Sequence, residues 1–334
     1  MLEKRRILAL CCAAHFAVDF ACALLLLGGL SEGAGRPFWL LLYNFCAFAL
    51  QMPLGLAADR YGLPIRLAAA GCLLTGAAYL FRPVPVLAVL AAGTGNALFH
   101  VGAGTHLLHM EKKRCGPLGL FVSPGALGLY LGALPALCRP GVLILTPLLL
   151  FGGGLIFWRA QKKEPLAALS FFPVLSAGGR FSAVCLFLAV CLRSLLSLSL
   201  PLPWKRGELW GLCLTLFTVL GKALGGFLAD RFGPRRISFL ALAFCLPLLF
   251  FCGLPLPGLL AVGLINMTMP ITLWALAQLL PGAKGFAFGI LTFALFLGFL
   301  PGYLHIGPAL SPAGAAAGAA VFLLLLQAAL RKGR

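Results

Sequence analysis

Two pairs of polar side chains interrupt long apolar runs and could carry chemistry inside a membrane. His15 and Asp19 are four residues apart in the first run, and Asn96 and His100 repeat that spacing in a later run. Residues four apart lie on one face of a helix. A carboxylate beside imidazole rings can bind and release a proton, so these residues predict a site for proton exchange or for a polar ligand.

Arg193 and Asn266 mark the second half of the chain in the same way, because each lies inside a long apolar run. Polar and ionisable groups at membrane depth are costly, so each is by default a candidate for a functional site. Asp19 and Arg193 both lie about 18 to 20 Å along the helices predicted from their runs, since a helix rises about 1.5 Å per residue. Both side chains are therefore expected near the middle of the bilayer.

The runs that carry these residues are long enough to cross a membrane. Of the 334 residues, 61% are hydrophobic and only 10% are charged, against roughly a quarter charged in soluble domains. A helix needs about 20 apolar residues to span the hydrocarbon core. The sequence therefore predicts an all-α integral membrane protein with twelve transmembrane helices, at residues 7–30, 37–57, 64–82, 85–109, 116–138, 140–158, 180–202, 207–229, 236–254, 257–280, 284–302 and 307–330.

Lysine and arginine are concentrated in alternate loops between these spans. With the N-terminus in the cytoplasm, nineteen of the 26 basic residues fall on the cytoplasmic side and five on the other. Cytoplasmic loops carry such an excess, so both termini are expected in the cytoplasm. Topology thus explains the net charge of +18, and no nucleic-acid partner is expected.

The twelve cysteines lie mostly inside apolar runs and form no C-x-x-C pair. Buried thiols of this kind behave as small hydrophobic groups, so neither a disulfide framework nor a zinc site is predicted. No metal and no cofactor is expected. The sequence also has no H-E-x-x-H motif. The chain is therefore not expected to be an enzyme, and a membrane-embedded enzyme using His15 and Asp19 is the weaker alternative.

An internal repeat divides the chain. Two octets, GLAADRYG and GFLADRFG, match at a constant offset of 171 residues. Both face the cytoplasm in the predicted topology, as expected of two parallel six-helix repeats. The chain is thus predicted to form two pseudo-symmetric six-helix bundles, residues 1–160 and 180–334, with a short cytoplasmic linker at 161–179. The octets share two glycines, an aspartate and an arginine, at Gly55, Asp59, Arg60 and Gly62 and at Gly226, Asp230, Arg231 and Gly233.

These octets resemble the cytoplasmic loop motif of the major facilitator superfamily, G-x-x-x-D-R-x-G-R-[RK]. In that family the aspartate caps a neighbouring helix, and the basic residues form charge pairs that hold one conformation closed. By analogy, the resemblance implies that Asp59 and Asp230 are gating residues. Arg235 and Arg236 follow the second copy, whereas Leu63 stands where a basic residue is usual after the first.

Three short segments of the first half carry a narrower resemblance. HFAVD at residues 15–19, QMPLG at 51–55 and GNALFH at 95–100 resemble the fosmidomycin-resistance branch of the superfamily, whose members export drugs or small molecules. In the superfamily fold, the first, fourth, seventh and tenth helices line the central cavity. The predicted spans at those four positions are the ones that hold the polar residues Asp19, Asn96, Arg193 and Asn266.

The repeat also predicts how the deep charges are related. Asp19 and Arg193 are 174 residues apart, close to the repeat offset, so we expect them to face each other across the pseudo-two-fold axis. They would form a charge pair or bind substrate together, with His15 or His100 as the proton-exchange partner. The alternative is that the polar pairs of the first half only join helices through hydrogen bonds.

These observations predict a multi-pass protein of the bacterial cytoplasmic membrane that moves a small molecule by alternating access. Coupling to protons is expected, and efflux of a drug or metabolite is a candidate role. We expect the chain to work as a monomer surrounded by lipid. A receptor or regulator that keeps the fold without transporting remains the alternative, because a fold does not fix a function.

Overall fold

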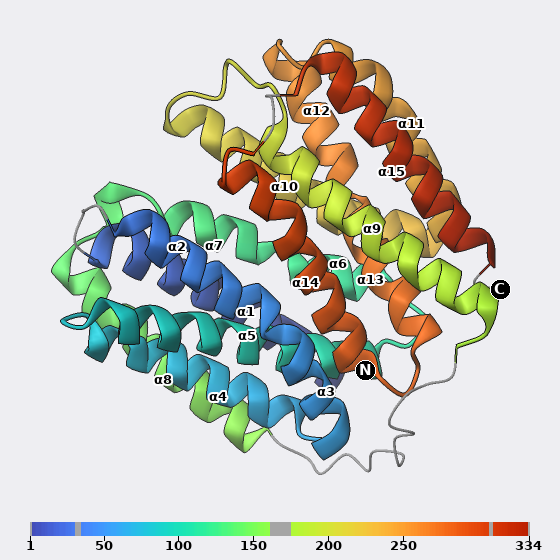
Figure 1. Cartoon of the computed structure of the whole chain (residues 1–334). Coiled ribbons are helices and arrows are strands. Elements are labelled where there is room, and N and C mark those ends of the chain that lie inside the picture. The colour runs from blue at the N-terminus through green and yellow to red at the C-terminus, as the bar shows by residue number, and fades with distance from the viewer. Residues whose placement is uncertain (1, 31–34, 161–174, 307–309, 333–334) are drawn as a thin grey trace. The chain divides into compact units, whose positions relative to one another are not determined.

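The computed structural model describes residues 2–30, 35–160, 175–306 and 310–332, and in these ranges the chain forms helices and turns without a strand (Figure 1). The helices of the first part are α1 (Leu2–Leu24), α2 (Arg36–Asn44), α3 (Gln51–Tyr61), α4 (Pro64–Ala77), α5 (Pro85–Met110), α6 (Gly116–Val122), α7 (Pro124–Gly132) and α8 (Pro140–Arg159). Those of the second part are α9 (Ala177–Ser199), α10 (Glu208–Phe232), α11 (Pro234–Phe250), α12 (Pro255–Asn266), α13 (Thr268–Leu279), α14 (Lys284–Tyr303) and α15 (Pro312–Lys332).

Short turns of other helix types continue some of these elements. They are the π turns η1 (Leu25–Gly29) and η2 (Phe45–Ala49) and the 3₁₀ turns η3 (Ala78–Phe81) and η4 (Pro135–Leu137). When consecutive pieces are joined, the described residues make twelve helical rods, at the places where the sequence predicts twelve spans. Ten of the rods are long and apolar enough to cross a membrane.

The two remaining rods are shorter. The fifth covers Gly116–Gly132, and the ninth is the 17-residue helix α11. The prediction carried the fifth span to residue 138, but α7 ends at Gly132 and an extended residue, Leu134, follows. The same rod is interrupted at Ser123, because Pro124 has no N–H to continue the helical hydrogen bonds. The last span was predicted to begin at residue 307. Residues 307–309 lie outside the described residues, and the corresponding helix, α15, begins at Pro312.

Two compact units make up the chain, and each mixes segments from both halves of the sequence. The first unit consists of Met1–Met110, Pro124–Phe172 and Gly282–Phe293. The second consists of Glu111–Ser123, Pro173–Pro281 and Ala294–Arg334. The predicted bundle boundaries stay a prediction. Most of the predicted linker, 161–174, lies outside the described residues, and α9 begins at Ala177, before the predicted start at residue 180.

In the first unit, α4, α5 and α8 run side by side (Figure 1). Aromatic contacts join them, since the rings of Phe99 on α5 and Phe157 on α8 lie 6.2 Å apart and both side chains are fully buried. The hydroxyl of Tyr79 in η3 donates to the carbonyl oxygen of Ala21 on α1 at 2.8 Å. The Tyr79 bond joins α1 to η3, which packs against α5, and α1 also packs directly against α5, so the two helices that carry the paired polar residues are neighbours.

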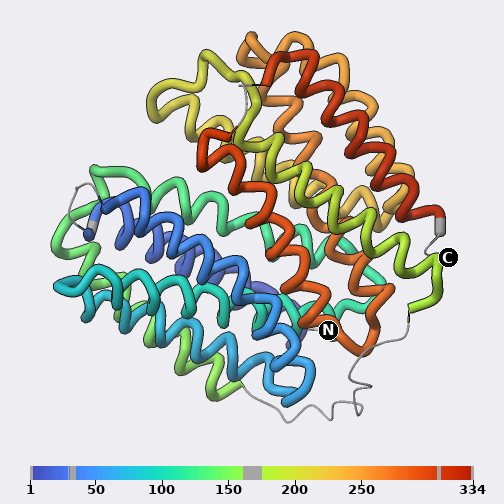
Figure 2. Tube along the Cα trace, in the orientation of Figure 1, coloured from blue at the N-terminus to red at the C-terminus, as the bar shows by residue number. Residues whose placement is uncertain are grey.

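In the second unit, α15 runs alongside both α9 and α11 (Figure 2). Ser182 on α9 donates to the carbonyl oxygen of Ala329 on α15 at 3.0 Å. Gln327 on α15 donates to the hydroxyl of Ser238 on α11 at 3.1 Å. A hydrogen bond between helices in lipid replaces one that water cannot supply, so these contacts hold the three helix ends together near the C-terminus.

Candidate functional site

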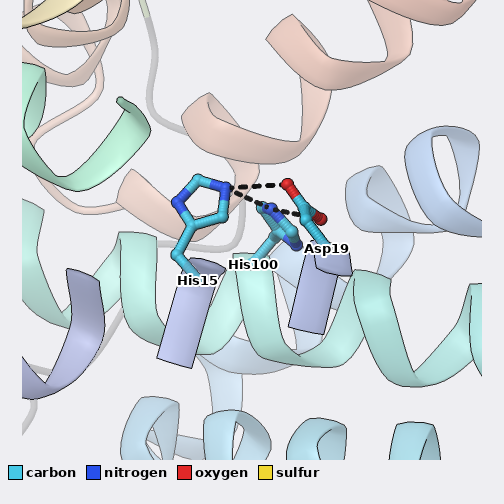
Figure 3. Close-up of side chains that lie close together, drawn as sticks. All are labelled: His15, Asp19 and His100. Carbon is cyan, nitrogen blue, oxygen red and sulfur yellow. Dashed lines mark hydrogen bonds and ion pairs between the residues drawn. The ribbon is translucent and has the colours of Figure 1, made fainter. Parts of the chain in front are cut away.

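The first unit brings four predicted site residues together on two helices, and Figure 3 shows three of them. Asp19 Oδ1 accepts a hydrogen bond from Asn96 Nδ2 at 2.9 Å, and Asp19 Oδ2 lies 3.3 Å from His15 Nε2. His100 Nε2 lies 2.9 Å from His15 Nε2 and 3.7 Å from Asp19 Oδ1. His15, Asp19 and Asn96 are buried, with 4% to 6% of each residue exposed. We call these four residues the His–Asp cluster.

The hydrogen-bond partners determine where protons can lie in the His–Asp cluster. His100 Nδ1 is 2.9 Å from the carbonyl oxygen of Asn96, which can only accept, so Nδ1 carries a hydrogen. In the neutral form, His100 Nε2 is then an acceptor, and His15 Nε2 donates to it. A further proton would sit on one of the two imidazoles beside the Asp19 carboxylate. The cluster thus has a place for one exchangeable proton and a charge to balance it.

Gly125, at the start of α7, makes room for this arrangement. A Cβ atom added at Gly125 would collide with His15 Nε2 and with Asp19 Oδ2. Gly128 and Gly132, on the same face of α7, also lie against α1, next to the backbone of Phe16 and of Phe20. Only a residue without a side chain allows α7 to cover the two polar groups at this distance. Because glycine has no side chain, the sequence gave no sign that Gly125 contacts the His–Asp cluster.

The same atoms could be read as metal ligands. One ligand atom from each of His15, Asp19 and His100 lies within 4.8 Å of the others, a two-histidine, one-carboxylate set that suits a transition metal. However, two nitrogen ligands on a tetrahedral ion at about 2.0 Å are roughly 3.3 Å apart, whereas His15 Nε2 and His100 Nε2 are 2.9 Å apart. That separation is a hydrogen-bond distance, so the arrangement fits a shared proton better than an ion.

The deep polar residues of the second unit are placed differently. Arg193 on α9 is 5% exposed, and its Nε has no hydrogen-bond partner among the described residues. Ser197, one turn later, donates to the carbonyl oxygen of Arg193. Asn266, the last residue of α12, donates to the carbonyl oxygen of Val262 in its own helix. Among the described residues of the second unit, none provides a counterion for this buried cation.

The predicted pairing of Asp19 with Arg193 stays a prediction. The two residues belong to different units. Within its own unit, Asp19 contacts His15, Asn96 and His100. The Asp19 carboxylate therefore has hydrogen-bond and charge partners within its own unit.

Asp59, from the first octet, caps the N-terminus of α14. Its Oδ1 accepts from the N–H of Gly285 at 2.8 Å, and its Oδ2 accepts from the N–H of Phe286 at 2.7 Å. The first amides of a helix have no partner within the helix and carry the positive end of its dipole. Gly55, one turn before Asp59, lies so close to Gly285 that a Cβ there would collide with its carbonyl oxygen. Glycine thus permits the approach that the carboxylate then stabilises.

Asp230, from the second octet, does the same for α6. Its Oδ1 accepts from the N–H of Cys115 at 2.6 Å, and its Oδ2 accepts from the N–H of Gly116 at 3.0 Å. Gly226, one turn earlier, leaves no room for a Cβ beside the carbonyl oxygen of Cys115. Arg114 Nε lies 3.6 Å from Asp230 Oδ2. The repeat found in the sequence is therefore also a repeat of contacts, one in each unit.

The other octet residues shape the loops after α3 and α10. Gly62 and Gly233 end these helices with φ angles of 67° and 91°, which glycine adopts without strain. The guanidinium of Arg60 lies 5.9 Å from the ring of Tyr61, and that of Arg231 lies 5.2 Å from the ring of Phe232. Arg235 Nε, by contrast, lies 3.4 Å from the amide oxygen of Gln327 on α15.

The described residues thus unite His15, Asp19, Asn96 and His100 in one cluster of the first unit, while Arg193 and Asn266 belong to the second unit. The resemblance implied that the octet aspartates cap neighbouring helices, but the sequence could not identify those helices, because backbone amides leave no signal in side-chain types. The sequence also placed Lys284 at the start of the span predicted at residues 284–302. In the structure Lys284 begins α14, is 4% exposed and donates to the carbonyl oxygen of Leu108 at 2.7 Å.

No family model matches the chain, and no curated protein matches it in sequence. Among solved structures it is similar to the major facilitator superfamily transporter FucP in the outward conformation, with a TM-score of 0.68 at 12% identity, over 97% of this chain and 98% of that chain. A second structure of FucP, described as the E. coli fucose:proton symporter, gives 0.66 at 14% identity over 97% and 98%. The human organic anion transporter MFSD10 gives 0.66 at 15% identity over 97% and 99%.

These similarities extend over nearly the whole length of each chain and confirm the predicted fold class, twelve helices in the major facilitator arrangement. At such low identities they show the fold alone. The resemblance to the fosmidomycin-resistance branch stays a prediction.

Proposed function

We propose that this chain is a secondary active transporter of the major facilitator superfamily, coupled to protons through the His–Asp cluster. The observation that carries the proposal is the contact of His15, His100 and Asp19 on α1 and α5, in which the two imidazole Nε2 atoms are 2.9 Å apart beside the buried carboxylate. Buried ionisable groups at membrane depth are rare and mark proton or substrate pathways. One of the structures with this fold is described as a fucose:proton symporter, so the fold is compatible with proton coupling.

The coupling step uses the charge of the cluster. With Asp19 ionised and both imidazoles neutral, the cluster carries one negative charge in a buried site. Taking up one proton makes it neutral overall, which lowers the cost of excluding water from the site. Gly125 on α7 lies against both His15 and Asp19, so a change in the charge of the cluster acts directly on α7. Protonation would therefore favour one position of α7 against α1, and deprotonation another.

Arg193 supplies the substrate chemistry that we propose. A buried guanidinium without a counterion is costly, and an anionic group of a substrate would offset that cost through a bidentate contact. A small organic anion, such as a carboxylate or phosphonate, fits this requirement. One protein with this fold is described as an organic anion transporter, and the resemblance to the fosmidomycin-resistance branch agrees with a small-molecule exporter.

The two octets are proposed as the gate of alternating access. Asp59 joins α3 to α14, and Asp230 joins α10 to α6. Each contact links a segment of one sequence half to a segment of the other, and each depends on charge-assisted bonds to backbone amides. Breaking both pairs of bonds would allow the two sequence halves to separate where these contacts lie. The excess of basic residues in the same loops supports a cytoplasmic position for this end and for both termini, in a bacterial cytoplasmic membrane.

The test is a flux measurement with the full chain in liposomes that enclose a pH-sensitive dye. Candidate carboxylates, phosphonates and sugars are added outside, and substrate-dependent movement of protons is recorded for the wild type and Asp19→Asn. Glu208→Gln is the matched control, because Glu208 is an exposed acidic residue in the first turn of α10, away from the His–Asp cluster. A chelator in a parallel sample tests the metal interpretation.

We expect at least one anion to drive proton flux in the wild type and in Glu208→Gln, with the flux lost in Asp19→Asn and unchanged by the chelator. Proton flux at the wild-type rate in Asp19→Asn would remove the cluster from the mechanism. Binding of an anion without flux of any kind would favour the alternative of a non-transporting receptor. Flux that requires a metal ion would replace the proton by that ion in the cluster.

A further inference from the structure

The second unit contains an open pocket of about 970 Å³ that is lined by residues of α9, α11, α13 and α15. Three arginines line it: Arg235 and Arg236 in the first turn of α11, and Arg331 in the last turn of α15. No acidic residue is among the residues that line the pocket. The nearby carboxylate of Asp230 already accepts the amides of Cys115 and Gly116. The pocket is therefore cationic, and nothing in its lining balances the charge.

The charge and the apolar surface of the pocket are separated along the helix axes. Phe239 lies one turn beyond Arg235 on α11, and Leu324 lies seven residues before Arg331 on α15, which places it about 10 Å deeper. Phe239 is 48% exposed and Leu324 is 69% exposed. In a chain that spans a membrane, residues exposed at that depth face hydrocarbon. The pocket thus has a positive end at the helix termini and an apolar wall towards the middle of the membrane.

The lining of the pocket includes a tryptophan. Trp274 on α13 lines the pocket, and its indole Nε1 is buried without a hydrogen-bond partner among the described residues. Buried indole N–H groups usually find an acceptor. The Nε1 atom has almost no exposed surface in this conformation, so the arginines and the apolar wall alone define the ligand that fits the pocket.

We propose that this pocket binds one anionic phospholipid, with the phosphate at Arg235, Arg236 and Arg331 and an acyl chain along Phe239 and Leu324. Basic pockets between membrane helices bind anionic headgroups, and nearby arginines contribute to the attraction. A free phosphate ion would use the arginines alone and leave the apolar wall without a partner. The pocket has its positive charge at one end and its apolar surface further along the helices, in the same way that a phospholipid has its phosphate at one end and its acyl chains beyond it.

The pocket also connects this lipid to the gating contacts. Arg235 contacts Gln327, whose amide in turn donates to the carbonyl oxygen of Arg235 and to Ser238. Asp230 lies five residues before Arg235, at the end of α10. A lipid phosphate on Arg235 would therefore hold the start of α11 and the end of α15 together, next to the loop that carries the second octet.

The experiment is native mass spectrometry of the full chain, purified in detergent and titrated with palmitoyl-oleoyl phosphatidylglycerol, with the matching phosphatidylcholine, and with glycerol phosphate. The pocket variant is R235Q/R236Q/R331Q. The matched control, K112Q/K113Q/R159Q, removes the same charge from three exposed basic residues that do not line the pocket. A second variant, R236Q/R331Q, keeps Arg235 and its contact with Gln327 in case the triple variant folds poorly.

We expect one phosphatidylglycerol to stay bound to the wild type and to the control variant, with phosphatidylcholine binding much more weakly. Affinity for phosphatidylglycerol should fall roughly a hundredfold in the pocket variant and roughly thirtyfold in R236Q/R331Q, if each arginine near the headgroup contributes as in other membrane proteins. Equal affinity of the wild type and both pocket variants would overturn the proposal. Binding of glycerol phosphate as tight as that of the lipid would also overturn it and assign the pocket to a soluble anion.

Discussion

Replacing Asp230 by alanine removes both acceptors from the N-terminal amides of α6. Asp230 Oδ1 and Oδ2 accept from the N–H groups of Cys115 and Gly116 at 2.6 and 3.0 Å. Asparagine at the same position keeps one acceptor and loses the charge. The two variants therefore form a graded series in which the gating contact of the second unit is weakened in one step and then removed.

The size of the effect follows from the contact. A side-chain cap contributes about 0.5 to 2 kcal/mol to a helix, and a negative charge at the N-terminus adds about 0.3 to 1 kcal/mol. The side chain of Asp230 is 19% exposed, so solvent screens the charge only in part. We expect a cost of about 2 kcal/mol for Asp230→Ala and about 1 kcal/mol for Asp230→Asn. Opening of this contact should then become roughly thirtyfold and fivefold more frequent, respectively.

Cys115 provides the assay. It is 2% exposed, and burial raises the pKa of its thiol, so it reacts with a maleimide only when the loop opens. Its alkylation rate is measured by mass spectrometry of the peptide that contains it, with the partly exposed Cys12 on α1 as a reference in the same sample. The rate at Cys115 should rise with the opening frequency, most in Asp230→Ala and less in Asp230→Asn. Glu208→Gln, at the other end of α10, should leave it unchanged.

Two results would refute this reasoning. Alkylation of Cys115 in Asp230→Ala at the wild-type rate would mean that the carboxylate does not hold α6 in place. An equal acceleration in Glu208→Gln would mean that any loss of charge on α10 loosens the loop. Hydrogen exchange at Gly285 and Phe286 in Asp59→Ala offers the parallel test in the first unit, where the same two bonds are present.

Two further predictions concern the polar residues within the membrane. Gly125→Ala places a methyl group against His15 and Asp19, so we expect proton-driven transport to fall at least tenfold, whereas Gly152→Ala, with nothing within 4 Å of the added carbon, should leave the flux unchanged. Arg193→Met should abolish binding of the anionic substrate in a titration but raise the melting temperature, because a buried charge without a counterion costs several kcal/mol that an apolar side chain of similar length does not. An Arg193→Met protein that melts lower than the wild type, or that still binds the anion, would contradict this account of Arg193.

The parts of the fold that follow local rules could be predicted from the sequence. Runs of about 20 apolar residues identify spans because the hydrocarbon thickness sets the length of a helix. The spacing of four between His15 and Asp19, and between Asn96 and His100, correctly placed each pair on one helix face. The two octets indicated a repeat, and the structure shows that they make equivalent contacts.

What depends on tertiary packing could not be predicted in the same way. The spacing of residues along one helix does not say which face of a second helix they will contact. The contact between His15 and His100 could therefore be found only in the structure. Gly125 has no side chain to indicate a role, yet it lies against both His15 and Asp19. The arginine pocket combines residues of several helices, whereas the sequence explained Arg331 by membrane topology alone and assigned Arg235 and Arg236 to the loop motif.

The most direct test of the proton-coupling account compares two modes of transport in Asp19→Asn. In exchange mode, labelled substrate inside liposomes is swapped for unlabelled substrate outside and no net proton movement is needed. In gradient mode, accumulation is driven by an imposed pH difference. The account predicts that Asp19→Asn retains exchange and loses gradient-driven accumulation, because asparagine resembles the protonated carboxyl group but cannot release a proton. Accumulation at the wild-type level in Asp19→Asn would contradict it.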